Sequence, residues 1–404
     1  MTALDQAGHR PLVAGRSALV APSWADARTA AHSAAEAAAG PGSESVALDA
    51  AFGRVLVDGV RAVTAMPAFT SSAMDGWAVS GTGPWLRTGT VLAGARSPRA
   101  LSPGEAVVIA TGAEVPAGTT AVLRSEDGVE ADGRVHGRVA DGADLRPAGE
   151  EAAAGDLLVP AGTVLRAAHL GLAAAAGHER LLVARAPRAA VLVLGDELLA
   201  AGPARDGRVR DALGPQLPAW IGALGAVHVR TSRVVDDAAQ LERSLAGAEA
   251  EVVITTGGTA AGPVDHLHRC LAALGARLVV DSVAVRPGHP MLLAELPDGR
   301  FVVGLPGNPL AAVVGLLTLA APLLDGLRGR PLARLGAVAL AGDADGPRHG
   351  TRLLPCALAP DGAVPRAATG SAMLRGLAAS DGLAVLGPGH HAARTVVPWL
   401  PLPA

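Results

Sequence analysis

Residues 188–198 read RAAVLVLGDEL, an uninterrupted apolar run that ends in Gly195 and two acids, Asp196 and Glu197. A run of small and branched apolar residues without alternating polar ones is typical of a strand buried on both faces of a sheet. Segments with strand and helix character then alternate as far as FVVGLPG at 301–307. Buried strands joined by helices of this length predict right-handed βαβ units and therefore a doubly wound α/β domain.

The chemically suggestive residues of this region directly follow its strands. Ligands of doubly wound sheets bind where the parallel strands end at their carboxyl side. We therefore expect these residues to meet at one edge of the sheet. The four motifs are GDE at 195–197, VVDD at 234–237, TTGGT at 255–259 and GLPGNP at 304–309.

Each motif also has a purely structural interpretation. The two aspartates of VVDD could cap a helix, and the acids of GDE could complement a helix dipole. Gly257 and Gly258 could simply make a tight turn, although they would also let backbone N–H groups approach a phosphate. Asn308 and Pro309 suit the first positions of a helix. The glycine pattern is not G-x-G-x-x-G, so it does not indicate a dinucleotide-dependent dehydrogenase.

The rest of the chain predicts three further domains around an α/β domain at 187–330. Short β-prone runs cut by Pro, Gly and Asp-Gly turns indicate a β-rich insertion module at 61–149. Ala- and Leu-rich flanks indicate one discontinuous helical linker domain, built from residues 1–60 and 150–186. β-type alternation with Gly and Pro punctuation indicates a small C-terminal β-domain at 331–404.

Composition excludes several classes of function. Of the 404 residues, 50% are hydrophobic and 18% are charged, and the net charge of -3 gives no reason to expect a nucleic-acid partner. The sequence contains no lysine and no tyrosine, which excludes a P-loop lysine, a Schiff-base lysine and a catalytic tyrosine. Two distant cysteines, Cys270 and Cys356, and an N-terminus without a signal-peptide core suit a cytoplasmic protein.

One segment, residues 308–329, reads NPLAAVVGLLTLAAPLLDGLRG and could be mistaken for a membrane span. Its apolar run is slightly short for a span of about 20 residues, contains Pro322 and follows an apolar strand through a tight turn. We therefore expect a buried crossover helix rather than a membrane helix.

The stretch MPAFTSSAMDGWAVS, at 66–80, places a single carboxylate, Asp75, among apolar and small residues. A buried charge in such company needs a partner or a function, because an isolated carboxylate is costly to bury. Other catalytic templates are incomplete. No G-x-S-x-G elbow is present, and His266 and Cys270 have helical spacing without further ligands nearby in the sequence.

Several motifs occur in an order that resembles one family, the molybdopterin molybdenumtransferases of the MoeA and gephyrin E-domain type. The resemblance runs from about residue 27 almost to the C-terminus, and its Asp-Gly, Thr-Gly, Gly-Gly and Pro-Gly-Asn-Pro elements are jointly specific. The motifs are FTSSAMDGWAV (69–79), VIATGAEVPAGTTAV (108–122), LRPAGEE (145–151), VLGDEL (193–198), TTGGTAAGPVD (255–265), VRPGHP (285–290), GLPGNP (304–309) and ATGSAMLRGL (368–377).

The resemblance implies an elongated four-domain homodimer whose doubly wound domain is MogA-like. Its active site would lie between this domain of one subunit and the β-rich module of the other. Members of the family take adenylylated molybdopterin and molybdate, cleave the phosphoanhydride with Mg²⁺, insert molybdenum into the dithiolene and release AMP. The molybdopterin adenylyltransferase is the protein partner that the resemblance suggests.

The resemblance also implies which positions carry the chemistry. Hard carboxylates suit a cation that bridges phosphate oxygens, and Asp236 and Asp265 are the candidates for Mg²⁺. The catalytic positions are Asp75, Thr111, Arg146, Glu151, Glu197, Asp236 and Asp265, with Glu151 standing where an aspartate is usual. The expected substrate- and cofactor-binding positions are Gly257, Gly258, Thr259, Arg286, Pro287, Gly288, His289, Pro306, Gly307, Asn308, Pro309 and Ser371.

Departures from the family pattern are found mainly on the predicted anion-binding wall. Arg286 and His289 replace two lysines of a Lys-Pro-Gly-Lys-Pro element; arginine keeps the charge, whereas histidine is only partly charged near neutrality. Ala311 replaces a serine, Leu213 an asparagine and Leu194 a hydroxyl residue.

An arginine expected in the C-terminal domain has two candidates, Arg348 and Arg352. Together with the changes on the anion-binding wall, this ambiguity leaves a second hypothesis open. The chain could be a catalytically weakened MoeA-like paralogue that binds a pterin or a nucleotide, or acts as a scaffold. The sequence does not separate a preference for molybdate from one for tungstate.

Overall fold

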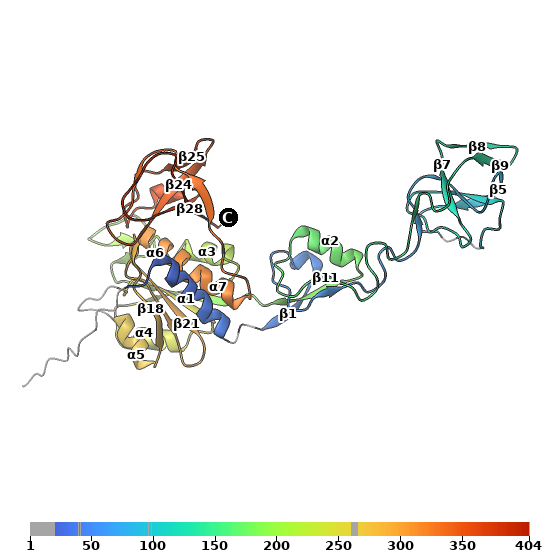
Figure 1. The fold of residues 1–404 in the computed structure, drawn as a ribbon. Coiled ribbons are helices and arrows are strands. Elements are labelled where there is room, and N and C mark those ends of the chain that lie inside the picture. The colour runs from blue at the N-terminus through green and yellow to red at the C-terminus, as the bar shows by residue number, and fades with distance from the viewer. Residues whose placement is uncertain are drawn as a thin grey trace, which may run out of the picture. The chain divides into compact units, whose positions relative to one another are not determined.

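The computed structural model describes residues 21–38, 40, 42–95, 97, 99–259 and 266–403. The chain divides into two compact units (Figure 1). One unit comprises Met1–Gly42 and Arg185–Ala404, and the other comprises Ser43–Ala184. The predicted multidomain architecture of α/β and β parts is confirmed by their sheets and helices.

The first unit is built around a six-stranded sheet with the strand order β16-β13-β17-β21-β20-β18. The first four strands are mutually parallel, as the buried apolar runs predict, and β20 and β18 join antiparallel. Strand β20 was not predicted, although the Pro-Asp-Gly turn after it is a hairpin signal. The strands are β13 (Arg188–Leu194), β16 (Val227–Val234), β17 (Val252–Thr256), β18 (Arg277–Asp281), β20 (Leu292–Glu295) and β21 (Phe301–Leu305).

Helices cover both faces of this sheet, so the domain is doubly wound as predicted (Figure 1). Alternate residues of β13 point to opposite faces: Val191 and Val193 belong to one buried cluster and Leu192 to the other. The helices of the first face are α1 (Trp24–Ala37), α3 (Leu217–Ala223), α6 (Pro309–Gly315) and α7 (Ala321–Leu327), and those of the second are α4 (Ala238–Ala246) and α5 (His266–Ala273).

Helix α1 corrects one predicted boundary, because residues 1–60 were assigned to the helical linker domain. The structure places α1 against α7 of the α/β unit. Ala27, Ala31 and Ala35 recur every four residues and are buried, which gives α1 a narrow, flat face. Gly326 allows close approach, because a Cβ added there would lie 2.7 Å from the Cβ of Ala35. Small residues on both helices thus join α1 to this unit.

The long apolar helix runs from Pro309 to Leu327 and is divided by a π-helical segment, η2 (Leu316–Ala320). Pro322 has no N–H to donate to the backbone carbonyl one turn earlier in the helix, and its ring would clash with that carbonyl in a regular α-helix. This accounts for the local change of helical period. The helix is long and apolar enough to cross a membrane, but 89% of its most apolar window is buried inside the protein. It is therefore a core helix, as the sequence predicts.

The C-terminal residues form a second six-stranded sheet in the same unit. One of its strands, β19 (Val285–Arg286), comes from the loop between β18 and β20 of the α/β sheet and pairs in parallel with β24. This pairing ties the C-terminal domain to the α/β domain. The remaining elements are β22 (Gly336–Ala339), β23 (Ala344–Asp345), β24 (Thr351–Ala359), β25 (Gly362–Pro365), α8 (Arg375–Ala378), β26 (Gly382–Leu386), β27 (His390–His391) and β28 (Val396–Pro401).

The second unit contains a mixed segment and a β-rich module. The mixed segment packs a helix and short antiparallel pairs around Leu56, Leu165 and Val183. The module is a six-stranded sheet with the order β7-β4-β6-β5-β9-β8 and a separate β3-β10 pair. The elements of this unit are β1 (Ser43–Ala47), η1 (Leu48–Ala50), β2 (Val60–Arg61), β3 (Ser71–Ser72), β4 (Gly76–Val79), β5 (Trp85–Val91), β6 (Glu105–Ile109), β7 (Ala121–Arg124), β8 (Gly128–Ala131), β9 (Arg134–Gly137), β10 (Leu145–Arg146), β11 (Leu157–Val159), α2 (Ala167–Ala175) and β12 (Arg180–Ala184).

Candidate functional site

A pocket of about 770 Å³ lies at the carboxyl edge of the parallel strands, and we call it the acid pocket. The residues after β13, β16, β17 and β21 all contribute to it, so the four strand-end motifs meet where the sheet topology predicts. Its described lining includes Glu197, Asp236, Asp237, Gly257, Gly258, Gly307, Asn308 and Pro309, together with Asp211, Thr256, His266 and the apolar residues Leu194, Leu198, Val209, Leu213, Val235, Leu241, Leu267 and Leu374.

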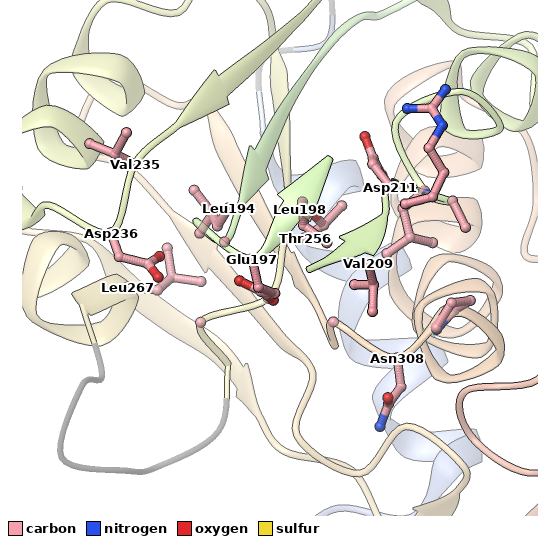
Figure 2. A pocket seen from close by; sticks show the side chains of 18 of the residues that line it. Leu194, Glu197, Leu198, Val209, Asp211, Val235, Asp236, Thr256, Leu267 and Asn308 are labelled. Carbon is pink, nitrogen blue, oxygen red and sulfur yellow. Dashed lines mark hydrogen bonds between the residues drawn. The ribbon is translucent and has the colours of Figure 1, made fainter. Parts of the chain in front are cut away.

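The carboxylates in the acid pocket differ in what they contact. Asp237 is the N-cap of α4, and its Oδ1 accepts a hydrogen bond of 2.7 Å from the backbone N–H of Gln240. The side chains of Glu197 and Asp236 are exposed and make no hydrogen bond to the described residues. Figure 2 shows both carboxylates directed towards the same part of the pocket. Asp237 therefore has the structural role, whereas Glu197 and Asp236 are available to a ligand.

Glycines leave space where the acid pocket needs it. Gly195 has a φ of 125°, and a Cβ added there would lie 2.5 Å from an oxygen of Glu197. The Glu197 side chain could move away from such a Cβ, so it is the positive φ, which L residues rarely adopt, that favours glycine at position 195. Gly257 and Gly258 have φ values of 85° and 71°, which L residues rarely adopt. The glycine pair thus has a conformational need as well as the open backbone that an anion could approach.

Asp211 is a wall residue of the acid pocket that sequence reasoning missed. Its side chain is 4% exposed and pairs with Arg233 at 2.7 Å. Its other interactions are with the backbone: Oδ1 accepts hydrogen bonds from the N–H groups of Leu213 and Gly214. Asp211 therefore fixes the turn that carries Leu213. A possible sequence signal was an aspartate two residues before an apolar residue and three before a glycine, the pattern of an Asx-turn.

A second pocket, of about 380 Å³, lies beside the first and is lined by basic and neutral residues; we call it the basic pocket. Arg286 and Arg352 both line it, and they face each other in the register of β19 and β24. Like charges directly opposite one another are destabilising, so an anion between them would be stabilising. None of the described lining residues is acidic; they are Arg286, Pro287, Gly288, His289, Pro290, Pro306, Asn308, Ala311, Arg352, Thr369 and Ser371.

Two hydrogen bonds orient basic side chains of the basic pocket. Arg352 donates from Nη1 to the carbonyl of Asp345 at 2.7 Å. His289 has its Nδ1 2.8 Å from the carbonyl of Val283, so Nδ1 carries the proton and donates it. The free Nε2 of His289 then accepts hydrogen bonds when the ring is neutral and donates one only when it is protonated. Of the two arginine candidates in the C-terminal domain, Arg352 lines the pocket and Arg348 does not.

Asn308 belongs to both pockets and marks their junction. It occupies the N-cap position of α6, with Pro309 at the first helical position as predicted, but its side chain makes no capping hydrogen bond. Instead the amide donates to Oγ of Ser371 at 3.3 Å, and the carbonyl of Ser371 accepts from the N–H groups of Leu310 and Ala311. A residue of the C-terminal domain thus caps the helix in place of Asn308.

In the second unit, Asp75 and Thr111 lie together. Oδ1 of Asp75 accepts hydrogen bonds from the backbone N–H and from the hydroxyl of Thr111, at 2.7 and 3.0 Å. These two hydrogen bonds, the backbone one foremost, lower the pKa of Asp75 from its ordinary value. Asp75 is exposed, and both of these hydrogen bonds to its Oδ1 come from Thr111.

The neighbouring predicted residues are placed as follows. Arg146 lies on β10, opposite Ser71 of β3, and is exposed. Glu151 is exposed, and its backbone N–H donates to the carbonyl of Met66. Arg124, which lies opposite Gly76 in the sheet, forms an ion pair with Asp144 through hydrogen bonds of 2.8 and 3.0 Å.

One further predicted residue, Thr259, lies away from both pockets. Thr259 is buried at 6% exposure and lines neither pocket; its methyl group packs against Gly304. Asp265 lies outside the described residues. Among the described residues, no group of three or more His, Cys, Asp or Glu side chains could by itself hold a metal ion.

A substitution of Thr111 tests the origin of the Asp75 pKa. Thr111→Val removes the hydroxyl and keeps the backbone N–H, so the pKa of Asp75 is expected to rise and yet stay below its ordinary value. Because the folded-state pKa is lowered, ionised Asp75 stabilises the fold above its unfolded-state pKa, and this contribution is lost as pH falls through the folded-state value. Carboxyl ¹³C NMR titration measures the shift, with Thr111→Ser as control. An unchanged pKa in Thr111→Val would contradict the assignment.

Comparisons with known proteins agree with this geometry. Residues 23–177 match the family "MoeA N-terminal region (domain I and II)", and residues 190–326 match the "Probable molybdopterin binding domain". The chain is 33% identical over 304 residues to the molybdopterin molybdenumtransferase of Nostoc sp., covering 71% of this chain and 70% of the relative. It is 30% identical over 302 residues to that of Staphylococcus epidermidis, covering 70% of this chain and 71% of the relative.

A solved structure gives the same result. The crystal structure of the molybdopterin biosynthesis MoeA protein from Pyrococcus horikosii matches with a TM-score of 0.80 and 26% identity, covering 95% of this chain and 100% of that chain. The chain therefore belongs to the molybdopterin molybdenumtransferase family.

Proposed function

We propose that this protein is a molybdopterin molybdenumtransferase, which inserts molybdenum from molybdate into adenylylated molybdopterin and releases AMP during molybdenum cofactor biosynthesis. The observation that carries the proposal is the junction at Asn308, where a pocket with free carboxylates adjoins a pocket with two arginines. The acid pocket suits a phosphoanhydride together with its bound cation, and the basic pocket suits an oxyanion.

The basic pocket is the proposed molybdate site. Molybdate is a doubly charged oxyanion, and Arg286 and Arg352 supply two opposed cations to it. Ser371 and Thr369 add hydroxyl donors on the same wall. Ala311 lies where the family has a serine, so one donor is lost, but the two guanidinium groups remain. This supports an active transferase more than the weakened paralogue.

The acid pocket is the proposed site of the pterin nucleotide. Glu197 and Asp236 have free oxygens directed into it, and either carboxylate can take the proton released when an oxygen nucleophile attacks the phosphoanhydride. The backbone at Gly257 and Gly258 offers an approach for phosphate oxygens without a Cβ in the way. The apolar wall excludes water around the bond that is cleaved.

The donor set of this pocket fits Mg²⁺. Magnesium prefers hard oxygen ligands and often uses only one or two carboxylates together with substrate phosphates, so a cluster of three protein ligands is not required. Asp236 has its carboxylate free for this role, and Asp265 is the second proposed ligand. When bound, Mg²⁺ would neutralise charge on the phosphate oxygens as the anhydride breaks.

The second unit supplies the remaining proposed catalytic residues, Asp75, Thr111, Arg146 and Glu151. We propose that the protein is a homodimer in which these residues act on the substrate held by the α/β domain of the other subunit. The resemblance to the family and the exposure of all four side chains support this arrangement. We further propose a cytoplasmic location, and the molybdopterin adenylyltransferase as a partner that would supply the substrate.

The decisive experiment measures AMP release by the purified protein. With Mg²⁺ and adenylylated molybdopterin, we expect AMP to appear only when molybdate is added. Omitting Mg²⁺, or adding a chelator, should abolish the release. Protein that binds the pterin nucleotide but never releases AMP on addition of molybdate would favour the paralogue that only binds its ligand.

A further inference from the structure

Two adjacent threonines on β17 have buried hydroxyl groups without partners. Thr255 is 0% exposed and Thr256 is 1% exposed, and the Oγ1 atom of each makes no hydrogen bond in the part of the chain that the structure describes. Within a parallel sheet the backbone carbonyls are already used by the ladder, so neither hydroxyl finds a local acceptor. A buried hydroxyl without a partner is destabilising, and such groups are few in native proteins.

The two hydroxyls differ in what they face. Side chains alternate along a strand, so Thr255 lies on the same face as Val253, in the cluster covered by α4 and α5. Thr256 lies on the other face and lines the acid pocket, between Val193 and Leu305 of the neighbouring strands. Figure 2 labels Thr256 among the side chains that line this pocket. Only the hydroxyl of Thr256 can therefore reach a molecule bound in this pocket.

A third unpartnered atom is found on the opposite side of the strand ends. His266, the first residue of α5, lines the acid pocket, and its Nδ1 is buried and has no hydrogen-bond partner among the residues that the structure describes. Thr256 and His266 thus each bring an unused neutral hydrogen-bonding group to one pocket.

The surroundings of these groups indicate the chemistry of their ligand. Around them the wall is apolar, with Leu194, Leu198 and Leu267 among the lining residues. Leu194 stands where the family has a hydroxyl residue, which makes this wall more apolar. A hydroxyl and an imidazole nitrogen can each donate or accept, which suits the edge of a neutral heteroaromatic ring rather than a phosphate. The apolar side chains suit the faces of such a ring.

We infer that Thr256 and His266 are ligand-binding residues that hydrogen-bond to the polar edges of the ring systems of the substrate. This inference rests on the proposed function, since adenine and pterin are the rings of adenylylated molybdopterin. Both rings combine apolar faces with an edge of alternating donors and acceptors, so the shared chemistry is that of a fused aminopyrimidine. A ring bound in the pocket then provides partners for the hydroxyl and the imidazole, which have none among the described residues.

The test compares Thr256→Val with Thr255→Val in the full-length protein. Both substitutions remove a buried, unpartnered hydroxyl from the same strand, so both should leave the unfolding temperature unchanged or raise it. Calorimetric titration then uses two probes, AMP and 6-hydroxymethylpterin. Thr256→Val is expected to weaken binding of at least one probe roughly 3- to 10-fold, whereas Thr255→Val binds both as the parent does.

Further variants keep the test decisive. Thr256→Ser retains the hydroxyl and should restore binding, and His266→Phe should weaken it to a similar extent. If a variant loses affinity for AMP alone, the substituted side chain contacts the adenine ring. If it loses affinity for the pterin alone, the side chain contacts the pterin ring. If Thr256→Val does not fold, Thr256→Ala and His266→Phe take its place. Equal binding by all variants, or an equal loss in Thr255→Val, would overturn the inference, whatever the outcome of the AMP-release assay on the parent protein.

Discussion

Glu197→Gln and Asp75→Asn are each expected to lower molybdate-dependent AMP release about 100-fold or more, the usual cost of removing one preorganised charged group from an active site. Glu197→Gln should leave stability unchanged, and Asp75→Asn should reduce it only slightly, because it loses the charge-assisted part of the hydrogen bonds from Thr111. The Glu197 carboxylate makes no hydrogen bond to the described residues, so the amide leaves no protein partner unpaired. At position 75 the amide oxygen can still accept the hydrogen bonds of Thr111. Initial rates and thermal unfolding of both variants measure the two effects.

A heterodimer of these two inactive chains is expected to regain about half of the parent activity. If each site uses Glu197 from one subunit and Asp75 from the other, the mixed dimer contains one intact site and one site with both changes. Two affinity tags on co-expressed chains allow the mixed dimer to be isolated from either homodimer. Its rate of AMP release can then be compared directly with that of the doubly tagged parent.

The matched control places both substitutions on one chain and pairs it with a parent chain. In that dimer each shared site carries one change, so activity should be lost. If each site were instead built from a single chain, the results would be reversed: the control would keep about half of the activity and the mixed dimer would have none. Monomeric protein with full activity would also exclude the shared site.

Arg352→Gln is expected to raise the KM for molybdate about 10- to 100-fold, because it removes a charge-assisted hydrogen-bond donor from the oxyanion. The change should leave the affinity for the pterin nucleotide unaltered, since Arg352 lines the basic pocket and not the acid pocket. Arg352→Gln removes the hydrogen bond to the carbonyl of Asp345 but also relieves the repulsion between the two opposed arginines, so the stability of the free protein should change little. Steady-state rates at varied molybdate give the KM.

Arg348→Gln is the control for this substitution, because Arg348 is exposed and lines neither pocket. It should leave the KM for molybdate unchanged. His289→Lys adds positive charge to the basic pocket, whereas Arg352→Gln removes it. The lysine carries a full positive charge, so the KM for molybdate should fall. An equal effect of Arg348→Gln and Arg352→Gln would remove the basis for placing molybdate in the basic pocket.

Much of the α/β domain could be predicted from the sequence because its signals are local. Apolar runs identify the parallel strands, and the known position of ligands in such sheets predicts that their terminal motifs meet. Helix α1 was misassigned, because an alanine-rich helix fits several partners and only the facing Gly326 decides between them. Strand β20 was missed because it is only four residues long and lies between two other apolar runs, β18 and β21, with which it pairs.

The site was harder to predict where contacts are long-range. Capping of α6 by Ser371 joins residues more than sixty positions apart, and no local pattern reveals it. The opposition of Arg286 and Arg352 depends on a strand register across two domains. Thr256 was overlooked because a threonine at the end of a buried strand looks like ordinary β-branched packing, and only the absence of a partner for its hydroxyl distinguishes it.

The two-residue strand β19 has a consequence for any shortened version of this protein. Because β19 completes the C-terminal sheet and carries Arg286, a chain that stops near residue 330 would lose Arg352, Thr369 and Ser371 and leave Arg286 without its neighbouring strand. The acid pocket would lose only Ala372 and Leu374 from its lining. If the acid pocket holds the pterin nucleotide and the basic pocket holds molybdate, as we propose, such a fragment would bind the first substrate with an incomplete site for the second, and it would compete with the intact protein for the pterin nucleotide.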